Sequence, residues 1–108
     1  MTDLPFKRID CHQALTLIEE GAVVADIRDE ASFERGHITD ARYLSNHNLQ
    51  QFIEENDLDT PLLVCCYHGN SSQSAAAFLA ERGFEQVYSI DGGYEAWQAQ
   101  FPDRCERP

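Results

Sequence analysis

Basic residues are scarce in this sequence, and their scarcity excludes two classes of partner. Eight Lys and Arg residues stand against 19 Asp and Glu residues in 108 positions, so the formal net charge is −11. Lys7 is the only lysine, and Lys7-Arg8 is the only adjacent basic pair. Nucleic acids and anionic membrane surfaces are bound through clusters of Lys and Arg. We therefore expect neither partner, and we interpret the excess of acids as a contribution to solubility.

Long apolar runs and a leader segment are also lacking. No stretch approaches the ~20 apolar residues of a membrane-spanning helix, and residues 1–10 lack the basic and then apolar pattern of a signal peptide. The hydrophobic content of 43% and the charged content of 25% are typical of a folded globular chain. A length of 108 residues suits one domain with a modest core. We therefore expect a single domain spanning residues 1–108 and a cytoplasmic location.

The four cysteines follow neither a disulfide framework nor a zinc motif. Cys65 and Cys66 are adjacent, whereas Cys11 and Cys105 stand alone. The sequence has no C-x-x-C pair and no two histidines at the spacing of a zinc site. A disulfide between neighbouring cysteines would be strained. We therefore expect a reducing compartment and no metal, with Cys11 and Cys105 as bystanders.

Short apolar runs alternate with segments of helical periodicity along the chain. Apolar and branched residues dominate the runs, a pattern typical of strands buried on both faces of a parallel sheet. Alternating strands and helices predict an α/β fold whose sheet is covered on both faces. The polar tail 102–108 is bounded by prolines and is expected to be frayed. The expected strands are 6–9, 22–27, 41–44, 62–66 and 87–90, and the expected helices are 11–20, 29–35, 48–56, 72–82 and 95–101.

A cysteine at the end of an expected strand is the most informative feature. Cys66 is followed by the short polar loop 67–71 and then by a helical segment. Backbone N–H groups of such a loop can converge on a sulfur, and the helix N-terminus adds a partial positive charge. Both effects lower a thiol pKa and favour the reactive thiolate. The pattern therefore favours a nucleophilic cysteine over a buried cysteine that merely precedes a turn.

The choice between the two adjacent cysteines follows from strand geometry. Consecutive strand residues point to opposite faces, and Cys66 is the one next to the loop. We therefore expect Cys66 to be the nucleophile and Cys65 to pack as a small hydrophobic side chain. Cysteine phosphatases carry a phosphate-clamping arginine six residues after the cysteine, where this chain has Ser72. Phosphate-ester or arsenate chemistry is therefore disfavoured, and a loop of backbone donors suits a smaller anion, the terminal sulfur of a persulfide.

Four segments in series resemble motifs of the single-domain rhodanese family. The resemblance as a whole covers roughly residues 18–101, and the cysteine loop is most similar to that of a bacterial type of thiosulfate sulfurtransferase. The resemblance implies a rhodanese-like three-layer α/β/α fold with a five-stranded, mostly parallel central sheet. The segments are Asp26-Ile27-Arg28, Phe33-Glu34-Arg35-Gly36-His37-Ile38-Thr39-Asp40-Ala41, Cys66-Tyr67-His68-Gly69-Asn70-Ser71-Ser72 and Val87-Tyr88-Ser89-Ile90-Asp91-Gly92-Gly93-Tyr94-Glu95-Ala96-Trp97.

The resemblance also implies an activity. The Cys66 thiolate would take the outer sulfur of thiosulfate, release sulfite, and pass the sulfur to a thiophile: cyanide in an assay, or a dithiol such as thioredoxin in the cell. No metal or organic cofactor is implied. A carrier that accepts sulfur from a protein persulfide shares all these residues and stays open, whereas Cys66 argues against a non-catalytic binding module. The persulfide-binding loop would consist of Tyr67, His68, Gly69, Asn70, Ser71 and Ser72.

Several residues around the loop are assigned supporting roles. Asp26 and Arg28 stand at the carboxyl end of an expected strand and are interpreted as an ion-pair or hydrogen-bond scaffold. His68 either contacts substrate or faces solvent, and Tyr67 either forms a wall of the pocket or covers the loop. The loop contains no Lys or Arg. Because thiosulfate is a dianion that approaches a chain of charge −11, we expect it to bind weakly, and added salt to help.

Overall fold

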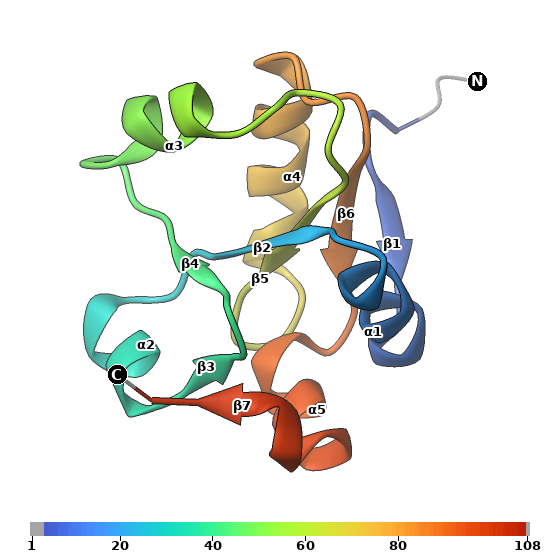
Figure 1. Ribbon diagram of the computed structural model, residues 1–108, viewed down its shortest axis with the longest axis vertical. Coiled ribbons are helices and arrows are strands. Elements are labelled where there is room, and N and C mark those ends of the chain that lie inside the picture. Colours follow the sequence, from blue (N-terminus) through green and yellow to red (C-terminus); the bar gives the residue numbers. More distant parts are fainter. Residues whose placement is uncertain (1–3, 108) are drawn as a thin grey trace.

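Five strands form one parallel sheet in the computed structural model, which describes residues 4–107 (Figure 1). Residues 1–3 and 108, which belong to the expected single domain, lie outside the described residues. The strand order β1-β6-β5-β2-β4 places β5 at the centre, and every pairing in this sheet is parallel. The expected α/β fold with a five-stranded sheet is confirmed. The strands are β1 (Lys7–Ile9), β2 (Val23–Asp26), β4 (Arg42–Tyr43), β5 (Leu62–Cys65) and β6 (Val87–Ile90).

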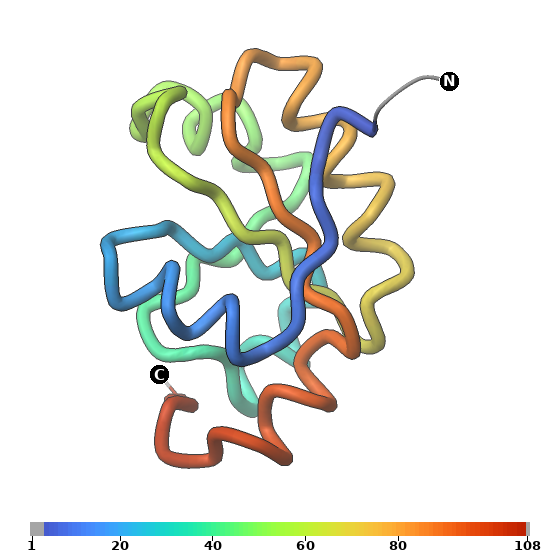
Figure 2. Tube along the Cα trace, turned by 90° about the vertical axis from the view of Figure 1, so that its right-hand side faces the viewer, coloured from blue at the N-terminus to red at the C-terminus, as the bar shows by residue number. Residues whose placement is uncertain are grey.

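Helices cover both faces of the sheet, and each face has its own apolar core. One core lies under α1 and α5, and the other lies under α3 and α4. Figure 2 shows α1 and α4 on opposite sides of the strands. No helix within residues 4–107 is both long and apolar enough to cross a membrane. The helices are α1 (Cys11–Glu19), α2 (Glu30–Arg35), α3 (Leu49–Glu55), α4 (Ser71–Glu81) and α5 (Gly93–Gln100).

Strand β5 divides its side chains between the two cores, as the period of two requires. Leu63 and Cys65 belong to the core under α1 and α5, whereas Leu62 and Val64 belong to the core under α3 and α4. This alternation fixes the direction of the next residue, Cys66, away from the side that Cys65 occupies. The sheet thereby presents the two neighbouring thiols to different surroundings.

Local signals in the sequence explain where α1 begins and ends. Asp10 Oδ1 accepts a hydrogen bond from Gln13 N at 2.8 Å, and Gln13 Oε1 accepts one from Asp10 N at 2.9 Å. This reciprocal capping box satisfies two backbone donors at the start of the helix, as the Asp-x-x-Gln spacing predicts. Gly21 follows the helix with φ +107, a backbone conformation that favours glycine.

The C-terminal segment is ordered, which corrects the prediction of a frayed tail. A 3-10 turn at Pro102–Arg104 leads into β7 (Cys105–Glu106), which pairs antiparallel with β3 (His37–Ile38). The prediction for 102–108 is therefore wrong for residues 102–106, and Pro108 lies outside the described residues. The two short strands form a separate two-stranded sheet beside α5 (Figure 1).

Contacts from residues far apart in the sequence explain why this tail is ordered. Arg104 O accepts hydrogen bonds from Trp97 Nε1 at 3.2 Å and from Thr39 N at 2.9 Å. Glu106 Oε1 accepts a hydrogen bond from Asp40 N at 2.7 Å and lies 3.3 Å from His37 Nε2. Composition alone indicates a loose polar end, because all of these partners except Trp97 lie far away in the sequence.

Candidate active site

The Cys66 sulfur lies in a cradle of backbone donors at the carboxyl end of the central strand. Strand β5 ends at Cys65, and α4 begins at Ser71, one residue before the predicted start. Gly69 N and Ser72 N both donate to Cys66 Sγ at 3.2 Å. Cys66 is 3% exposed. The convergence of loop N–H groups that the sequence predicts is therefore present.

The surroundings of Cys66 favour its thiolate form. Burial raises the pKa of the Cys66 thiol, but hydrogen bonding from Ser72, by side chain and backbone, and from the Gly69 and His68 backbone lowers it by more. The net effect places the pKa below that of an ordinary thiol, 9.0. A thiolate is the nucleophilic form of cysteine, so this site suits covalent catalysis.

The neighbouring thiol of Cys65 has the opposite environment. Its side chain is fully buried among apolar residues. Burial raises its pKa well above that of an ordinary thiol, and the carboxylate of Asp26 raises it further. Its sulfur only approaches Cys66 O, at 3.6 Å. This thiol therefore stays protonated and inaccessible.

The start of α5 holds the loop in shape, a contribution that the sequence reasoning missed. Tyr94 N donates to Cys66 O at 2.7 Å, and Glu95 N donates to Tyr67 O at 3.2 Å. The start of α5 thus binds the carbonyls of Cys66 and Tyr67, and the N–H groups of the loop are free to face the sulfur. Gly93 permits this approach, because a Cβ there would lie 2.4 Å from Cys66 O. The Gly92-Gly93 pair by itself predicts a turn, and no local signal in the sequence indicates that the cysteine loop packs on it.

The loop itself packs closely on the same turn. Gly69 has φ +90, and a Cβ at this position would lie 2.8 Å from Gly92 N and 3.0 Å from Ile90 O. Ser72 is fully buried, with Oγ 2.7 Å from Ser89 Oγ. Asn70 and Ser71 are exposed, and Asn70 occupies the N-cap of α4 without a side-chain hydrogen bond. The structure thus brings Gly69 and Ser72 to the sulfur, and leaves the side chains of the two residues between them in solvent.

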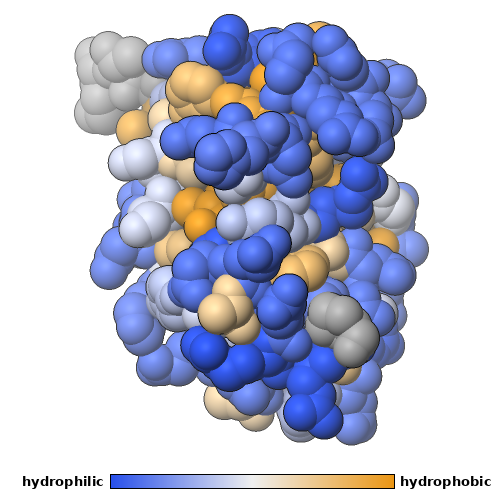
Figure 3. Space-filling model, turned by 90° about the vertical axis from the view of Figure 1, so that its left-hand side faces the viewer, coloured by the Kyte–Doolittle hydropathy of each residue, from blue (hydrophilic) through white to orange (hydrophobic). Residues whose placement is uncertain are grey.

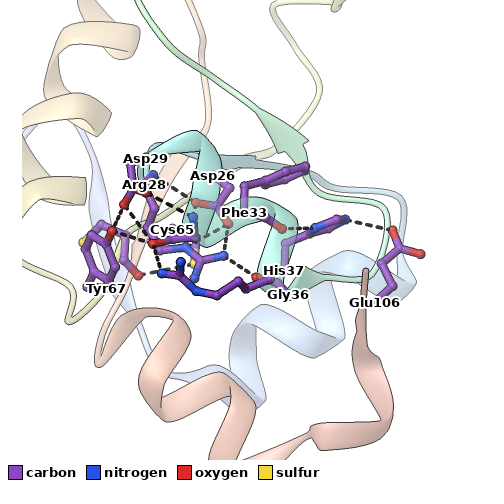
Figure 4. Close-up of polar contacts among 12 residues, drawn as sticks. Asp26, Arg28, Asp29, Phe33, Gly36, His37, Cys65, Tyr67 and Glu106 are labelled. Atoms are coloured by element: carbon purple, nitrogen blue, oxygen red, sulfur yellow. Dashed lines mark hydrogen bonds and ion pairs between the residues drawn. The ribbon is translucent and has the colours of Figure 1, made fainter. Parts of the chain in front are cut away.

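Asp26 and Arg28 form a buried ion pair beside the loop. Arg28 Nη2 lies 2.8 Å from Asp26 Oδ2, and Arg28 Nε donates to Asp26 Oδ1 at 3.0 Å (Figure 4). Arg28 Nη2 also donates to Gly36 O at 2.6 Å, and its guanidinium lies 4.1 Å from the centre of the Tyr94 ring. The charges of the pair neutralise each other, so both residues support the ends of β2 and α2 as a scaffold.

Tyr67 ties the loop to the start of α2. Its hydroxyl donates to the Asp29 carboxylate and lies 2.7 Å from Ser32 Oγ (Figure 4). Asp29 is also the N-cap of α2, where it accepts a hydrogen bond from Ser32 N at 3.1 Å. Tyr67 is 45% exposed and forms part of a groove wall. The sequence left open whether Tyr67 forms a wall of the pocket or covers the loop, and its position in the groove matches the first role.

Arg28 lines two grooves, and the second of them is bordered by Tyr67 and His68 of the cysteine loop. One groove, of about 380 Å³, lies between α3 and α4, with Leu44, Leu49 and Phe78 among its walls beside polar residues such as Ser45 and Asn46. Figure 3 shows the face that carries α2 and α3: hydrophilic residues dominate it, and hydrophobic ones appear between them. The second groove, of about 410 Å³, is called the polar groove here because nearly all of its lining side chains carry polar atoms. It is lined by Arg28, Ser32, Arg35, Gly36, Tyr67, His68, Tyr94, Glu95 and Gln98.

The polar groove holds one residue that the sequence reasoning missed and one that it left open. Arg35 lies far from Cys66 in the sequence, and its motif carries no sign that it borders the cysteine loop. His68 is 62% exposed and its Nδ1 lies 3.2 Å from Glu95 Oε2. His68 therefore faces the groove mouth and solvent. Within residues 4–107, no group of three or more His, Cys, Asp or Glu side chains is placed to hold a metal ion.

A sulfur cradle on a parallel α/β sheet, with these motifs, identifies the class of protein. Residues 10–100 match the model of the Rhodanese-like domain family, and the chain belongs to this family. The solved rhodanese-like domain of the Anabaena sp. Alr3790 protein superposes with a TM-score of 0.80 at 24% identity, covering 94% of this chain and 79% of that one. That likeness concerns the fold.

Particular relatives are much more similar in sequence. The chain is 62% identical over 97 residues to the thiosulfate sulfurtransferase GlpE of Ectopseudomonas mendocina (strain ymp), which covers 90% of this chain and 89% of that protein. It is 55% identical over 106 residues to the thiosulfate sulfurtransferase GlpE of Stutzerimonas stutzeri (strain A1501), covering 98% and 95%. The alignments thus extend over nearly the whole of each protein.

Proposed function

We propose that this chain is a thiosulfate sulfurtransferase that works through a persulfide on Cys66. The observation that carries the proposal is the pair of backbone donors, Gly69 N and Ser72 N, at 3.2 Å from Cys66 Sγ. Donors fixed by the fold stabilise an anionic sulfur without a charged side chain. The two relatives named thiosulfate sulfurtransferase GlpE support the choice of donor.

In the first half of the reaction the Cys66 thiolate attacks the outer sulfur of thiosulfate. A new S–S bond forms on Cys66, the S–S bond of thiosulfate breaks, and sulfite leaves with the bonding electron pair. Charge is conserved, because a thiolate and a dianion become a persulfide anion and a sulfite dianion. The loop from Tyr67 through Gly69 to Ser72 holds the persulfide, with the N–H groups of Gly69 and Ser72 as donors.

In the second half a thiophile removes the outer sulfur and restores the thiolate. Cyanide attacks this sulfur and leaves as thiocyanate. A dithiol gives a disulfide and hydrogen sulfide instead, and we propose a protein dithiol such as thioredoxin as the acceptor in the cell. All four cysteines of the chain are free thiols, a state that suits the cytoplasm. We assign the activity to the single domain that contains the motif-bearing residues 18–101.

Intact-protein mass after incubation with thiosulfate tests the proposal. We expect the wild type and Cys65→Ser to gain one sulfur atom that cyanide removes, and Cys66→Ser to gain none. A gain in Cys66→Ser would assign the persulfide to another residue. If no variant gains sulfur from thiosulfate, a persulfide-bearing donor protein is the next reagent to test, and transfer from it would make the chain a sulfur-relay carrier.

A further inference from the structure

Arg35 brings a positive charge to a loop that has none of its own. Arg35 is the last residue of α2 and lines the polar groove together with Tyr67 and His68, the two residues that follow Cys66. Its Nη2 donates to Ser32 Oγ at 3.0 Å, and Ser32 Oγ lies 2.7 Å from the Tyr67 hydroxyl. Two hydrogen bonds therefore connect the guanidinium to the cysteine loop.

The other charges of the polar groove are already engaged. Arg28 is bound to Asp26 in the buried pair, and Glu95 Oε2 lies 3.2 Å from His68 Nδ1, a contact that is an ion pair when His68 is protonated. Within residues 4–107, Arg35 forms no ion pair with a carboxylate. A guanidinium has five N–H donors, and Ser32 takes one of them. Arg35 thus keeps donors for a bound anion.

The charged wall continues into an adjoining groove of about 330 Å³. The two grooves share Arg35, Gly36, Tyr94 and Gln98, and the second adds Cys105, Glu106 and Arg107. Three of the eight basic residues of a strongly acidic chain therefore line this one side of the molecule. Arg35 belongs to both grooves.

We propose that Arg35 binds the sulfonate end of the thiosulfate donor at the mouth of the Cys66 loop, and releases it as sulfite. The proposal rests on the proposed function and names a donor-binding residue for it. A planar guanidinium matches two oxygens of such an anion with parallel N–H groups. Arg35 holds the oxygens while the outer sulfur enters the cradle of backbone donors. A local cation also reduces the repulsion between a dianion and a chain of charge −11.

Arg35→Gln and Arg42→Gln form a matched pair for the test. Arg42 is exposed and pairs with Glu55 at 3.2 Å on another part of the surface. Both substitutions remove one positive charge, so long-range effects of net charge are equal. We expect Arg35→Gln to raise the KM for thiosulfate about fivefold with kcat unchanged, the effect of losing one partly screened charge-assisted contact. Arg42→Gln is expected to keep the wild-type KM, and Arg35→Lys to restore part of the binding.

The change of kcat/KM with salt concentration is a second measurement, and its direction is expected to differ between the wild type and Arg35→Gln. The wild type is expected to lose kcat/KM as neutral salt is added, because the ions screen an attraction. In Arg35→Gln only the overall repulsion is left, so salt should no longer lower kcat/KM. This expectation replaces the general benefit of salt inferred from net charge alone. Equal KM values and equal salt slopes in the two Gln variants would overturn the role of Arg35.

Equilibrium binding separates this proposal from the proposed function. Calorimetry measures thiosulfate binding to Cys66→Ser and to Cys66→Ser/Arg35→Gln, neither of which can form the persulfide on Cys66. We expect about fivefold weaker binding in the double variant. Equal binding overturns the assignment of Arg35 whether or not the wild type transfers sulfur. If the wild type takes no sulfur from thiosulfate while Arg35 still governs binding, the proposed function fails and the anion site stands.

Discussion

The two adjacent thiols of this chain show how strongly position on a strand decides chemistry. Cys65 is the last residue of β5 and is enclosed by the core under α1 and α5. Cys66 is the first residue after the strand, and its sulfur meets two backbone donors. The pKa of the first thiol is raised well above its ordinary value, and that of the second is lowered.

The difference teaches that a serine hydroxyl and backbone N–H groups can together activate a sulfur without a basic side chain. No Lys or Arg lies in the loop, and the hydrogen bonds that lower the pKa of Cys66 come from Ser72, Gly69 and His68. Such a site depends on the exact path of the chain, because an N–H group must point at the sulfur. Substitutions at the positions that set this path should therefore reduce the difference in pKa and reactivity between the two thiols.

The largest expected effect is the contrast in alkylation by iodoacetamide. We expect Cys66 to react at least about 100-fold faster than Cys65, because hydrogen bonding lowers the pKa of Cys66, whereas Cys65 stays protonated and reacts only after local opening. The pKa of Cys66 lies below 9.0, so its rate should be half-maximal below pH 9.0 and should fall as the thiolate is protonated at lower pH. Peptide mapping of the labelled protein measures each site. Comparable rates at the two cysteines would refute the contrast.

The next largest effect is expected from Gly93→Ala. The new Cβ would lie 2.4 Å from Cys66 O and 2.6 Å from Tyr67 O, at a residue with φ +58, so the loop must move away from α5. We expect kcat/KM to fall about 100-fold and the free energy of unfolding to fall by about 2–4 kcal/mol. The movement should also raise the pKa of Cys66, making it more like that of Cys65.

Gly21→Ala is the matched control for this substitution. Gly21 also has positive φ, +107, but nothing lies within 4 Å of its added Cβ. It should lose only about 1 kcal/mol of stability from the backbone conformation and keep its kcat/KM. Denaturant unfolding and steady-state kinetics of both variants decide the matter. A Gly93→Ala enzyme with the kinetics of Gly21→Ala would mean that α5 does not hold the loop.

A smaller effect is expected from Ser72→Ala. The substitution removes the hydroxyl and keeps the N–H that donates to Cys66 Sγ, so the cradle is weakened and not destroyed. We expect a rise in the pKa of Cys66 and a roughly three- to tenfold loss of kcat/KM. Ser89 Oγ also loses its partner, which costs about 1 kcal/mol of stability. Ser74→Ala, on the exposed side of the same helix, should change neither quantity.

Much of this site could be predicted from the sequence because its signals are local. The strand before Cys66, the glycine of the loop and the helix after it are continuous in the chain, and their order sets the donors around the sulfur. Strand alternation likewise separates Cys65 from Cys66. The Asp10 capping box and the closing strand Val87–Ile90 were predicted for the same reason: a short segment contains the whole signal.

The parts that could not be predicted depend on contacts between distant segments. Gly93 supports Cys66 although α4, β6 and a turn separate the two in the sequence, and the sequence indicates the turn but not what packs on it. Arg35 reaches the groove because α2 packs near Tyr67, which no local pattern states. The pairing of β3 with β7 joins segments more than half the chain apart, so a polar tail with prolines predicts fraying when it is considered alone.

The smallest effect on catalysis is expected from Cys65→Ala, which removes the second thiol. Its sulfur has one weak contact, to Cys66 O at 3.6 Å, and it fills space in the core. We expect the loss of one buried atom to cost about 1 kcal/mol of unfolding free energy and kcat/KM to stay within about twofold of the wild type. Unfolding curves and kinetics under the same conditions measure both. A tenfold loss of kcat/KM with little loss of stability would show that the buried thiol acts on the reaction. Unchanged kinetics with a weaker fold would show that two neighbouring, identical side chains divide packing and chemistry between them.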